Sequence, residues 1–496
     1  MTVASAAGAP PNRVTSWSSI NWRTVQNQVF RLQVRIAKAV EEKRYGKAKA
    51  LQWLLTHSWA AKLLAVRRVT TNKGKKTPGI DGVVWRTAQD KLNAARSLSR
   101  HGYRPLPLRR VHIPKANGKL RPLGIPVMRD RAMQALYALA LEPITEVRAD
   151  KHSYGFRRNR STADALSQLF IVLSRKDSPQ WVLDADIKAC FDRISHDWLL
   201  RNILMDTVVL RSWLKAGYID RHVFFSTEEG TPQGGIISPL LANAALDGLE
   251  AALRDAISRS GAKVNLVRYA DDFVITGCSR ELLEKVVLPV VTAFMAQRGL
   301  TLSPEKTHIV HIDEGFDFLG CNVRKYSGKL LIKPAKLKVL AFVRSLRKLI
   351  KSQRGGSASE LIRQLNAKLR GWGNYYRPFS AKKTYSFVDS EVFHALRRWM
   401  IRRHRNKSEA WCWKKYFRRD GNRDVFHGTV SSHSGDTKVK VVDLFRMSSI
   451  TIKRHIKVRG DVHPFQPDCS TYLAKRRPVH RQRKRFDRWY RAELYG

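Results

Sequence analysis

The first part of the chain alternates apolar and polar residues with the period of a helix. Two sets of apolar residues recur at steps of three and four, on either side of Tyr45-Gly46. The first set is Val25, Val29, Leu32, Ile36 and Val40, and the second is Leu51, Leu55, Trp59, Leu63 and Val66. This spacing predicts two amphipathic helices that pack as a hairpin on the main domain.

A different pattern, with apolar residues on both sides of two adjacent acids, occupies residues 265–276. Asn265-Leu266-Val267-Arg268 and Phe273-Val274-Ile275-Thr276 flank Tyr269-Ala270-Asp271-Asp272. Short β-branched runs around such a centre predict two strands joined by a tight turn, with the acids at its tip. Another apolar run, residues 181–186, predicts a strand that brings Asp184 and Asp186 to one face, because side chains alternate along a strand.

Two further runs predict a hairpin that carries basic side chains. Residues 110–114 and 120–126 have the pattern of extended chain and flank Asn117-Gly118, a strong turn signal. Lys115, Lys119 and Arg121 lie on this hairpin. From the residues alone, solvated side chains on a surface ribbon explain them as well as an anion-binding role does.

Residues 335–405 return to the helical period and predict a unit of three helices. In the first helix the inward positions are Val339, Val343, Leu346 and Ile350, and the outward ones include Arg344, Arg347 and Lys348. Ser357 followed by Glu360 fits a capping box for the second helix. Asp389 or Ser390 is expected to cap the third. From about Lys414 the chain is rich in Arg, His and aromatic residues.

The charge of the chain indicates a polyanionic partner. The 496 residues include 92 Lys and Arg against 41 Asp and Glu, a formal net charge of +51 that is spread along the sequence. Such a charge opposes compaction unless a polyanion neutralises it. We therefore expect an extended nucleic-acid surface whose affinity falls steeply with salt. The basic faces of the N-terminal helices are candidates for part of that surface.

Cysteine usage and hydropathy favour an intracellular, cytoplasmic protein. The five cysteines are scattered without a Cys-x-x-Cys pair, which predicts neither a disulfide frame nor a zinc site. No apolar run reaches the roughly 20 residues of a membrane span, and residues 1–11 lack the basic and hydrophobic regions of a signal peptide. No membrane partner is expected.

The paired acids point to metal chemistry. Asp271 and Asp272 would repel each other unless a cation lies between or beside them. Two-metal phosphoryl transfer needs such acids, since cations about 4 Å apart hold the attacking and leaving oxygens in line. Strings of the form Tyr-x-Asp-Asp also occur in ordinary surface turns, so the tetrapeptide needs support from other parts of the chain.

Several blocks in one order resemble reverse transcriptases. Residues 269–272 resemble motif C of that family, residues 230–239 (Gly-Thr-Pro-Gln-Gly-Gly-Ile-Ile-Ser-Pro) resemble motif B, and residues 299–307 resemble motif D. Further matching blocks are residues 77–82, 130–134, 153–157, 181–192 and 316–320. The resemblance covers roughly residues 70 to 325. It implies an α/β (α+β) chain with the right-hand polymerase fold of fingers, palm and thumb.

The resemblance also implies a role for each matching residue. Two Mg²⁺ ions would be held by Asp186, Asp271, Asp272 and the backbone carbonyl of Ile187. The residues expected to contact the nucleotide are Lys115, Arg121, Phe191, Gln233, Gly234 and Lys306. Lys115 and Arg121 would clamp the triphosphate, and Phe191 would lie under the sugar and select deoxynucleotides. Lys306 would assist the leaving pyrophosphate. From the residues alone, Phe191 also fits a core aromatic and Lys306 a surface lysine.

The C-terminal part narrows the resemblance. Residues 365–376, Leu-Asn-Ala-Lys-Leu-Arg-Gly-Trp-Gly-Asn-Tyr-Tyr, resemble the thumb, or X domain, of group II intron maturases, and the basic remainder resembles the DNA-binding domain of the same family. The implied nucleic-acid contacts are Arg157, Arg344, Arg347, Lys348, Arg454, Lys475, Arg476 and Arg477. Many members end in a His-Asn-His endonuclease with paired cysteines and histidines. The sequence lacks that cluster, so second-strand cleavage is not expected.

The expected organisation is a helical extension in residues 1–70, fingers and palm in 71–328, thumb in 329–410 and a basic DNA-binding domain in 411–496. The implied function is an RNA-directed DNA polymerase that assists splicing of its group II intron RNA and copies it by target-primed reverse transcription during retrohoming. Its partners would be that RNA, target DNA, a primer and dNTPs; the oligomeric state is not predicted. A free-standing host reverse transcriptase, or an RNA-binding splicing cofactor with a vestigial polymerase, stays open as an alternative.

Overall fold

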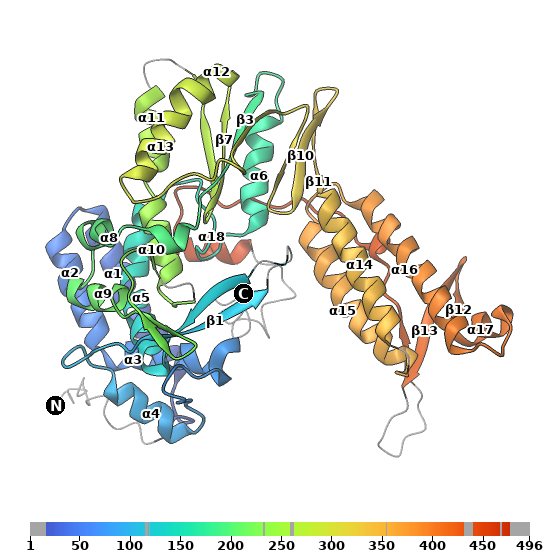
Figure 1. Cartoon of the computed structure of the whole chain (residues 1–496), viewed down its shortest axis with the longest axis horizontal. Coiled ribbons are helices and arrows are strands. Elements are labelled where there is room, and N and C mark those ends of the chain that lie inside the picture. Colours follow the sequence, from blue (N-terminus) through green and yellow to red (C-terminus); the bar gives the residue numbers. More distant parts are fainter. Residues whose placement is uncertain are drawn as a thin grey trace, which may run out of the picture. The chain divides into compact units, whose positions relative to one another are not determined.

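The chain forms two compact units, each built from separate parts of the sequence. A computed structural model describes residues 16–114, 118, 120–231, 234–257, 262–353, 355–430, 440–466 and 469–476 (Figure 1). Unit 1 contains residues 1–165, 181–309 and 458–496, and unit 2 contains residues 166–180 and 310–457. These units divide the chain differently from the four expected domain ranges, which remain predictions.

Three α-helices, and not two, occupy residues 22–71 of unit 1. They are α1 (Trp22–Glu41), α2 (Tyr45–His57) and α3 (Trp59–Thr71). The expected second helix is interrupted at Ser58, whose extended backbone ends α2. The Ser58 hydroxyl accepts a hydrogen bond from the Ala61 N–H at 3.2 Å and so caps α3, satisfying one of the amides that a new helix start leaves without a partner.

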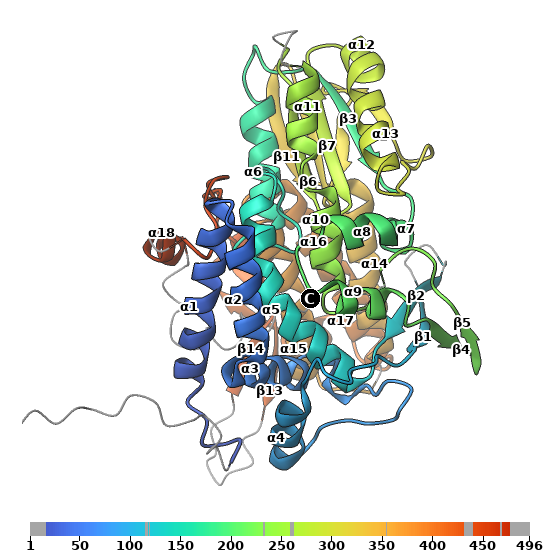
Figure 2. The same cartoon turned by 90° about the vertical axis from the view of Figure 1, so that its left-hand side faces the viewer.

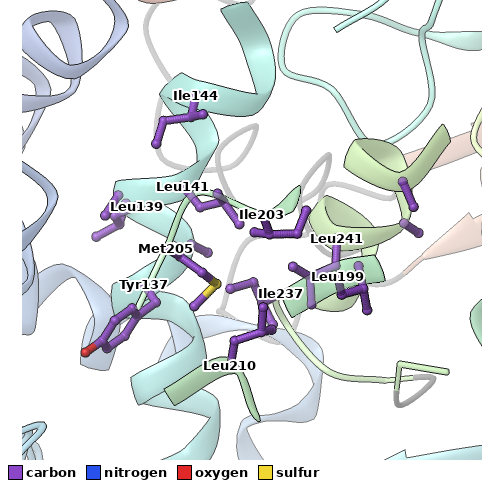
Figure 3. Packing of buried hydrophobic residues seen from close by; sticks show 14 of the residues in the cluster. Tyr137, Leu139, Leu141, Ile144, Leu199, Ile203, Met205, Leu210, Ile237 and Leu241 are labelled. Carbon is purple, nitrogen blue, oxygen red and sulfur yellow. The ribbon is translucent and has the colours of Figure 1, made fainter. Parts of the chain in front are cut away.

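A buried helix, α5 (Met128–Arg148), is the centre of the unit 1 core. Nearly its whole length is buried, and it packs against α1, α2, α3 and α10 (Ser238–Leu246). Figure 3 shows Tyr137 and Leu141 of α5 gathered with Ile203, Met205 and Leu210. Burying aliphatic side chains of this size stabilises a fold by about 1.5–3 kcal/mol each. The predicted packing of the N-terminal helices on the main domain is confirmed.

The predicted basic hairpin is confirmed as part of a four-stranded sheet. β1 (Leu108–Pro114) pairs antiparallel with β2 (Leu120–Ile125), and the sheet order is β2-β1-β4-β5, with β4 (Tyr218–Asp220) parallel to β1 and β5 (Val223–Phe225) at the edge. The register ends at Pro114↔Leu120. Within the turn, Gly118 is described and has φ +79°, a left-handed conformation that favours glycine.

A second four-stranded sheet carries the acidic motif. Its order is β6-β7-β3-β8, formed by β3 (Trp181–Asp186), β6 (Asn265–Tyr269), β7 (Asp272–Gly277) and β8 (His308–His311). Figures 1 and 2 show α11 (Leu249–Ile257) and α13 (Leu288–Ala296) beside this sheet. The other described helices of unit 1 are η2 (Lys73–Lys76), α4 (Ala88–Ser97), α7 (Cys190–Arg193), α8 (His196–Asn202), α9 (Thr207–Leu214), α12 (Arg280–Leu282), η3 (Leu283–Val287) and α18 (Cys469–Lys475). Most of α6 (Thr162–Leu173) belongs to the segment 166–180 of unit 2.

Unit 2 contains the three predicted helices, α14 (Lys336–Ser352), α15 (Ala358–Tyr376) and α16 (Lys382–Arg403). The four inward positions of α14 are all buried, and Ser357 caps α15 by accepting from the Glu360 N–H. The expected cap of the third helix is wrong. Asp389 lies inside α16, and its carboxylate instead accepts hydrogen bonds from the backbone of Met447 and Ser448, both at 2.8 Å.

Short strands flank these helices in unit 2. β9 (Phe316–Phe318), β10 (Cys321–Tyr326) and β11 (Lys329–Pro334) form one antiparallel sheet before α14. α17 (Glu409–Tyr416), β12 (Phe417–Asp420), β13 (Arg423–Val430), β14 (Lys440–Asp443) and η4 (Met447–Ser449) follow α16. Nowhere in the described part of the chain is a helix long and apolar enough to cross a membrane.

Candidate active site

The two adjacent acids lie at the tip of a tight β-hairpin. β6 and β7 pair from Asn265↔Thr276 to Tyr269↔Asp272, so Ala270 and Asp271 alone form the loop. Ala270 has φ +59°, the positive value that two-residue hairpin loops need at their first position. The predicted arrangement of strand, turn and strand is confirmed.

The third acid reaches the hairpin through the neighbouring strand. β3 pairs antiparallel with β7, and the register sets Asp186 opposite Asp272. Directly opposed residues of an antiparallel pair lie on the same face, with Cβ atoms about 4.5–5.5 Å apart. The sheet therefore brings Asp186, Asp271 and Asp272 together from distant parts of the sequence.

Burial and neighbouring carboxylates raise the pKa of the two acids of the hairpin. Asp272 is partly exposed to solvent. Its pKa is nevertheless raised to about 6, mainly by the loss of hydration and further by the charges of Asp271 and Asp186. Burial also raises the pKa of Asp271, and the Asp186 charge adds to that shift. The cluster is one that a bound cation would stabilise.

A cation of the protein itself contacts these acids. Lys306 Nζ lies 2.6 Å from Asp186 Oδ2, and the lysine side chain is otherwise exposed. The hydrogen bond to Asp186 raises the pKa of Lys306 above its ordinary value. The Asp186 carboxylate therefore already binds one positively charged group.

The oxygen donors around Asp186 fit a hard metal ion. Ile187 forms an antiparallel β-bridge with Leu302. The two hydrogen bonds of this bridge are made by the residues on either side: the Ser303 N–H donates to the Asp186 carbonyl (2.8 Å), and the Lys188 N–H donates to the Thr301 carbonyl (2.9 Å). Neither of these two bonds uses the Ile187 carbonyl. Carboxylate and carbonyl oxygens are the ligands that Mg²⁺ prefers. Asp186, Asp271 and Asp272 occupy neighbouring positions of the sheet, but among the residues that the structure describes no three His, Cys, Asp or Glu side chains are already arranged as a metal-binding group.

The block at residues 153–157 supports the acidic hairpin. Ser153 bridges Arg268 of β6, and the Tyr154 N–H donates to the Arg268 carbonyl at 2.9 Å. A Cβ on Gly155 would overlap the Ala270 nitrogen and would lie 2.8 Å from the Tyr269 carbonyl carbon. Glycine is the residue that permits this close approach of two backbones.

A buried ion pair that the sequence analysis missed holds the same turn. Arg268 is fully buried, pairs with Asp247 and donates hydrogen bonds to Asn243 Oδ1 and to the Ala270 carbonyl, each at 3.3 Å. Asn243 Nδ2 in turn donates to the Gly155 carbonyl at 2.8 Å. Burial raises the pKa of Asp247 to about 7, while the Arg268 charge opposes the shift. The available signal was a charged residue in an otherwise apolar strand, because buried charges are almost always paired.

Arg157 is structural, which corrects its expected contact with nucleic acid. Its buried guanidinium pairs with Glu146 at 2.9 Å and donates to the carbonyls of Asp150 (2.8 Å) and Ser153 (3.0 Å). Arg160 pairs with the same Glu146 at 3.3 Å. Since the Arg157 donors are used inside the protein, this side chain presents no face to a phosphate.

Two expected nucleotide contacts, Lys115 and Gln233, lie outside the described residues. Arg121 is exposed on β2, and its charge lowers the pKa of Asp271 against the effect of burial. The expected clamp residue thus lies within electrostatic reach of the acidic cluster.

Phe191 and Gly234 each lie close to another part of unit 1. The Phe191 ring meets Phe156 edge to face, with ring centroids 6.3 Å apart. Gly234 has φ +108°, and a Cβ there would lie 2.7 Å from the Gly124 carbonyl oxygen of β2. Both positions are compatible with the expected nucleotide contacts, which remain predictions.

The remaining expected nucleic-acid contacts divide by exposure. Five are exposed, namely Arg344, Arg347, Lys348, Arg454 and Lys475. Arg476 is mostly buried, pairs with Asp164 at 2.6 Å and donates to the Asn159 carbonyl at 3.1 Å, which corrects its expected role as well. Arg477 lies outside the described residues.

Three family descriptions match separate parts of the chain. Residues 113–323 match "Reverse transcriptase (RNA-dependent DNA polymerase)", residues 17–98 match "N-terminal domain of reverse transcriptase", and residues 339–417 match "Group II intron, maturase-specific domain". Along the chain, the N-terminal match comes first, the reverse transcriptase match second and the maturase match third.

Individual proteins are similar over longer stretches. The chain is 34% identical over 313 residues to Protein YkfC of Escherichia coli (strain K12), which covers 55% of this chain and 82% of that protein. It is 29% identical over 412 residues to Group II intron-encoded protein LtrA of Lactococcus lactis subsp. cremoris, and this match covers 63% of this chain and 68% of that protein. Among solved structures, telomerase from Candida albicans with a fragment of telomeric RNA gives a TM-score of 0.36 at 13% identity, over 62% of this chain and 63% of that one, a likeness too distant to carry an argument.

Proposed function

The chain belongs to the reverse transcriptases that carry a group II intron maturase domain, and from this we propose that it polymerises DNA on an RNA template with Asp186, Asp271 and Asp272 as its catalytic acids. One observation carries the assignment of these acids. The β3–β7 register sets Asp186 opposite Asp272, beside the turn that holds Asp271.

The proposed cofactor is a pair of Mg²⁺ ions, held by the three aspartates and the Ile187 carbonyl. Three observations support the fit: the hard oxygen donors, the raised pKa values of Asp271 and Asp272, and the ammonium group that contacts Asp186. Such ions, when bound, lower the pKa of a primer 3′-hydroxyl and neutralise the charge on the transferring phosphates.

The surrounding residues would bind and orient the nucleotide. Arg121 would hold phosphate oxygens in its planar fork, with Lys115 beside it. Phe191, in contact with Phe156, would lie under the sugar and exclude a 2′-hydroxyl. Lys306 would leave Asp186 and donate a proton toward the departing pyrophosphate. Gln233 and Gly234 would line the nucleotide and the template base.

We also propose that the chain binds group II intron RNA during splicing and copies it from a primer at a DNA target. The maturase-domain match at residues 339–417 and the exposed cations of unit 2 support this role. The protein would contribute no splicing nucleophile. Its cations would screen phosphate repulsion so that the RNA folds. The thumb at 329–410 and the DNA-binding domain at 411–496 are part of this proposal.

Primer extension tests the polymerase proposal. Purified protein should incorporate dNTPs onto a DNA primer annealed to an RNA template, and Asp271→Asn should lower the rate by about 10³-fold or more, because metal electrostatics supply several kcal/mol. Asp313→Asn, an exposed carboxylate of unit 2, is the matched control and should extend normally. No incorporation by the unaltered protein, or full activity of Asp271→Asn, contradicts the proposal.

A splicing assay separates the maturase role from the alternatives. A group II intron transcript should splice at low Mg²⁺ when the protein is present, and Asp271→Asn should still support splicing because it keeps the RNA-binding surface. Extension without any effect on splicing would favour a free-standing reverse transcriptase. Splicing support without extension would favour a cofactor with a vestigial polymerase.

A further inference from the structure

A groove on unit 2 has basic walls. It lies along α14 and α16 and has a volume of about 480 Å³. Arg347 and Lys351 contribute to it from α14, and Arg398 and Arg402 contribute from α16. All the residues that line it are described, and none of them is acidic.

The spacing of these cations concentrates their charge. Arg347 and Lys351 are four residues apart on one helix, as are Arg398 and Arg402 on the other, so each pair shares a helix face. Like charges at this spacing repel each other and destabilise a helix. Glu391 pairs with Arg347 from outside the lining of the groove. A local excess of positive charge of this kind is the electrostatic signature of a polyanion site.

The floor of the groove is apolar. Its apolar lining residues are Ile350 and Ala395, which are almost fully buried, and Ile401, which is 40% exposed and offers the largest apolar surface of the three. A row of phosphates needs only the cations and gains nothing from such a floor. The flat face of a nucleobase does gain, because apolar contact removes its surface from water whichever base it is. The volume is within the range of small-molecule pockets.

We propose that this groove binds one unstacked nucleotide of a single-stranded RNA. The base lies on Ile350, Ala395 and Ile401, and the flanking phosphates contact Arg398 and Arg402. Bases within a duplex are stacked and paired and cannot enter, so the groove selects loops, bulges and strand ends. The inference rests on the proposed function, which supplies the RNA, and adds the mode by which the helical unit recognises it.

Photo-cross-linking tests where the RNA lies. The probe is an RNA of about 12 nucleotides containing 4-thiouridine, within the site sizes of single-strand binders, used alone or annealed to its complement with the full-length protein. The single strand should cross-link to peptides of α14 and α16, and the duplex should not. Equal cross-linking by the duplex, or single-strand cross-links only outside these helices, overturns the proposal.

Affinity variants separate the pocket from general charge. Ala395→Met fills the floor and keeps every cation. It should weaken single-strand affinity by about fourfold or more, as expected when apolar contact worth about one buried methylene is lost, without changing the dependence on salt. Arg398→Gln with Arg402→Gln should instead lower the slope of log K against log salt by roughly 1.4, about 0.7 for each phosphate that is no longer neutralised. Unchanged affinity in Ala395→Met overturns the proposal.

Two further variants control for misfolding and for nonspecific loss of charge. Ile401→Ser alters the floor at an exposed position if Ala395→Met fails to fold, and it should also weaken single-strand binding. Lys368→Gln with Lys383→Gln removes two exposed cations of α15 and α16 outside the groove and should leave groove cross-linking unchanged. Primer extension by the unaltered protein, measured in parallel, tests the proposed function. Extension without groove cross-links refutes this inference alone.

Discussion

Two arginines that lie behind the acidic hairpin of unit 1 are buried and paired, whereas the cations along the groove of unit 2 are exposed. Arg268 and Arg157 have almost no exposed surface, and each is bonded to a carboxylate and to backbone carbonyls. Arg398 and Arg402 lie on the surface of α16. The two buried arginines fix the backbone segments that they bond, whereas the two exposed arginines present charge to a partner. In sequence the four residues are the same basic type.

The two arrangements have different energetic consequences. Removing one member of a buried pair leaves its partner charged and uncompensated, which is strongly destabilising. Removing an exposed cation costs little stability, because water and salt already screen it. Stability measurements and binding measurements therefore report on different regions of this molecule, and four substitutions test that division.

The largest expected effect on stability is that of Arg157→Gln. The change leaves Glu146 buried with Arg160 as its remaining cation, so we expect a loss of about 3–5 kcal/mol in the free energy of unfolding. Urea denaturation followed by circular dichroism measures it. A loss below about 1 kcal/mol would mean that Arg157 behaves as a surface residue, against its buried position.

Gly155→Ala tests whether backbone contact positions the catalytic turn. The added Cβ would overlap the Ala270 nitrogen, and a shift of about 1 Å at a catalytic group costs on the order of 100-fold in rate. Single-turnover primer extension measures the loss. Gly46→Ala is the matched control, since a Cβ there meets nothing within 4 Å, and it should extend as the unaltered protein does. Equal rates for both variants would separate residues 153–157 from the site.

Asp130 makes stability depend on pH in unit 1. It accepts hydrogen bonds from Tyr103 Oη (2.7 Å) and the Leu106 N–H (3.0 Å), and burial raises its pKa from 3.8 to about 6. The folded state therefore binds its proton more tightly than the unfolded chain, and the contribution of Asp130 to stability falls as pH rises from about 4 to 6. Relative to Asp130→Asn, the unaltered protein should lose about 1–3 kcal/mol over that range. A difference that is constant or grows with pH contradicts this.

The smallest expected effect is that of Arg347→Gln in unit 2. Arg347 pairs with Glu391 at the surface, and such pairs contribute about 0–1 kcal/mol. Urea denaturation should show a change within that range. A loss as large as that expected for Arg157→Gln would remove the contrast between the two regions.

The periodicity of apolar residues along the sequence correctly predicted individual strands and helices. The alternation at residues 181–186 and 265–276 predicted three of the strands that bring the acids together, and helical spacing predicted the buried face of α14. The family match confirms the predicted α+β, right-hand polymerase class and its reverse transcriptase and maturase function.

Long-range packing decided the rest. The sequence does not reveal that Arg157 meets Glu146 or that Arg268 meets Asp247, because each partner lies on a different element. Asp389 resembled a helix cap, yet the helix begins earlier and its carboxylate bonds the segment at Met447. Ser58 was overlooked because the apolar spacing continues through the break between α2 and α3.

The central claim is that Asp186, Asp271 and Asp272 bind divalent metal as one cluster, and ferrous-ion cleavage tests it most directly. Fe²⁺ in place of Mg²⁺, supplied with hydrogen peroxide and ascorbate, reduces the peroxide to hydroxyl radicals that cut nearby backbone, and the fragments can be mapped by mass spectrometry. We expect cuts at both residues 186–188 and 270–272, and loss of both sets in Asp186→Asn. Cuts at one segment only, or an unchanged pattern in Asp186→Asn, would contradict a shared metal site.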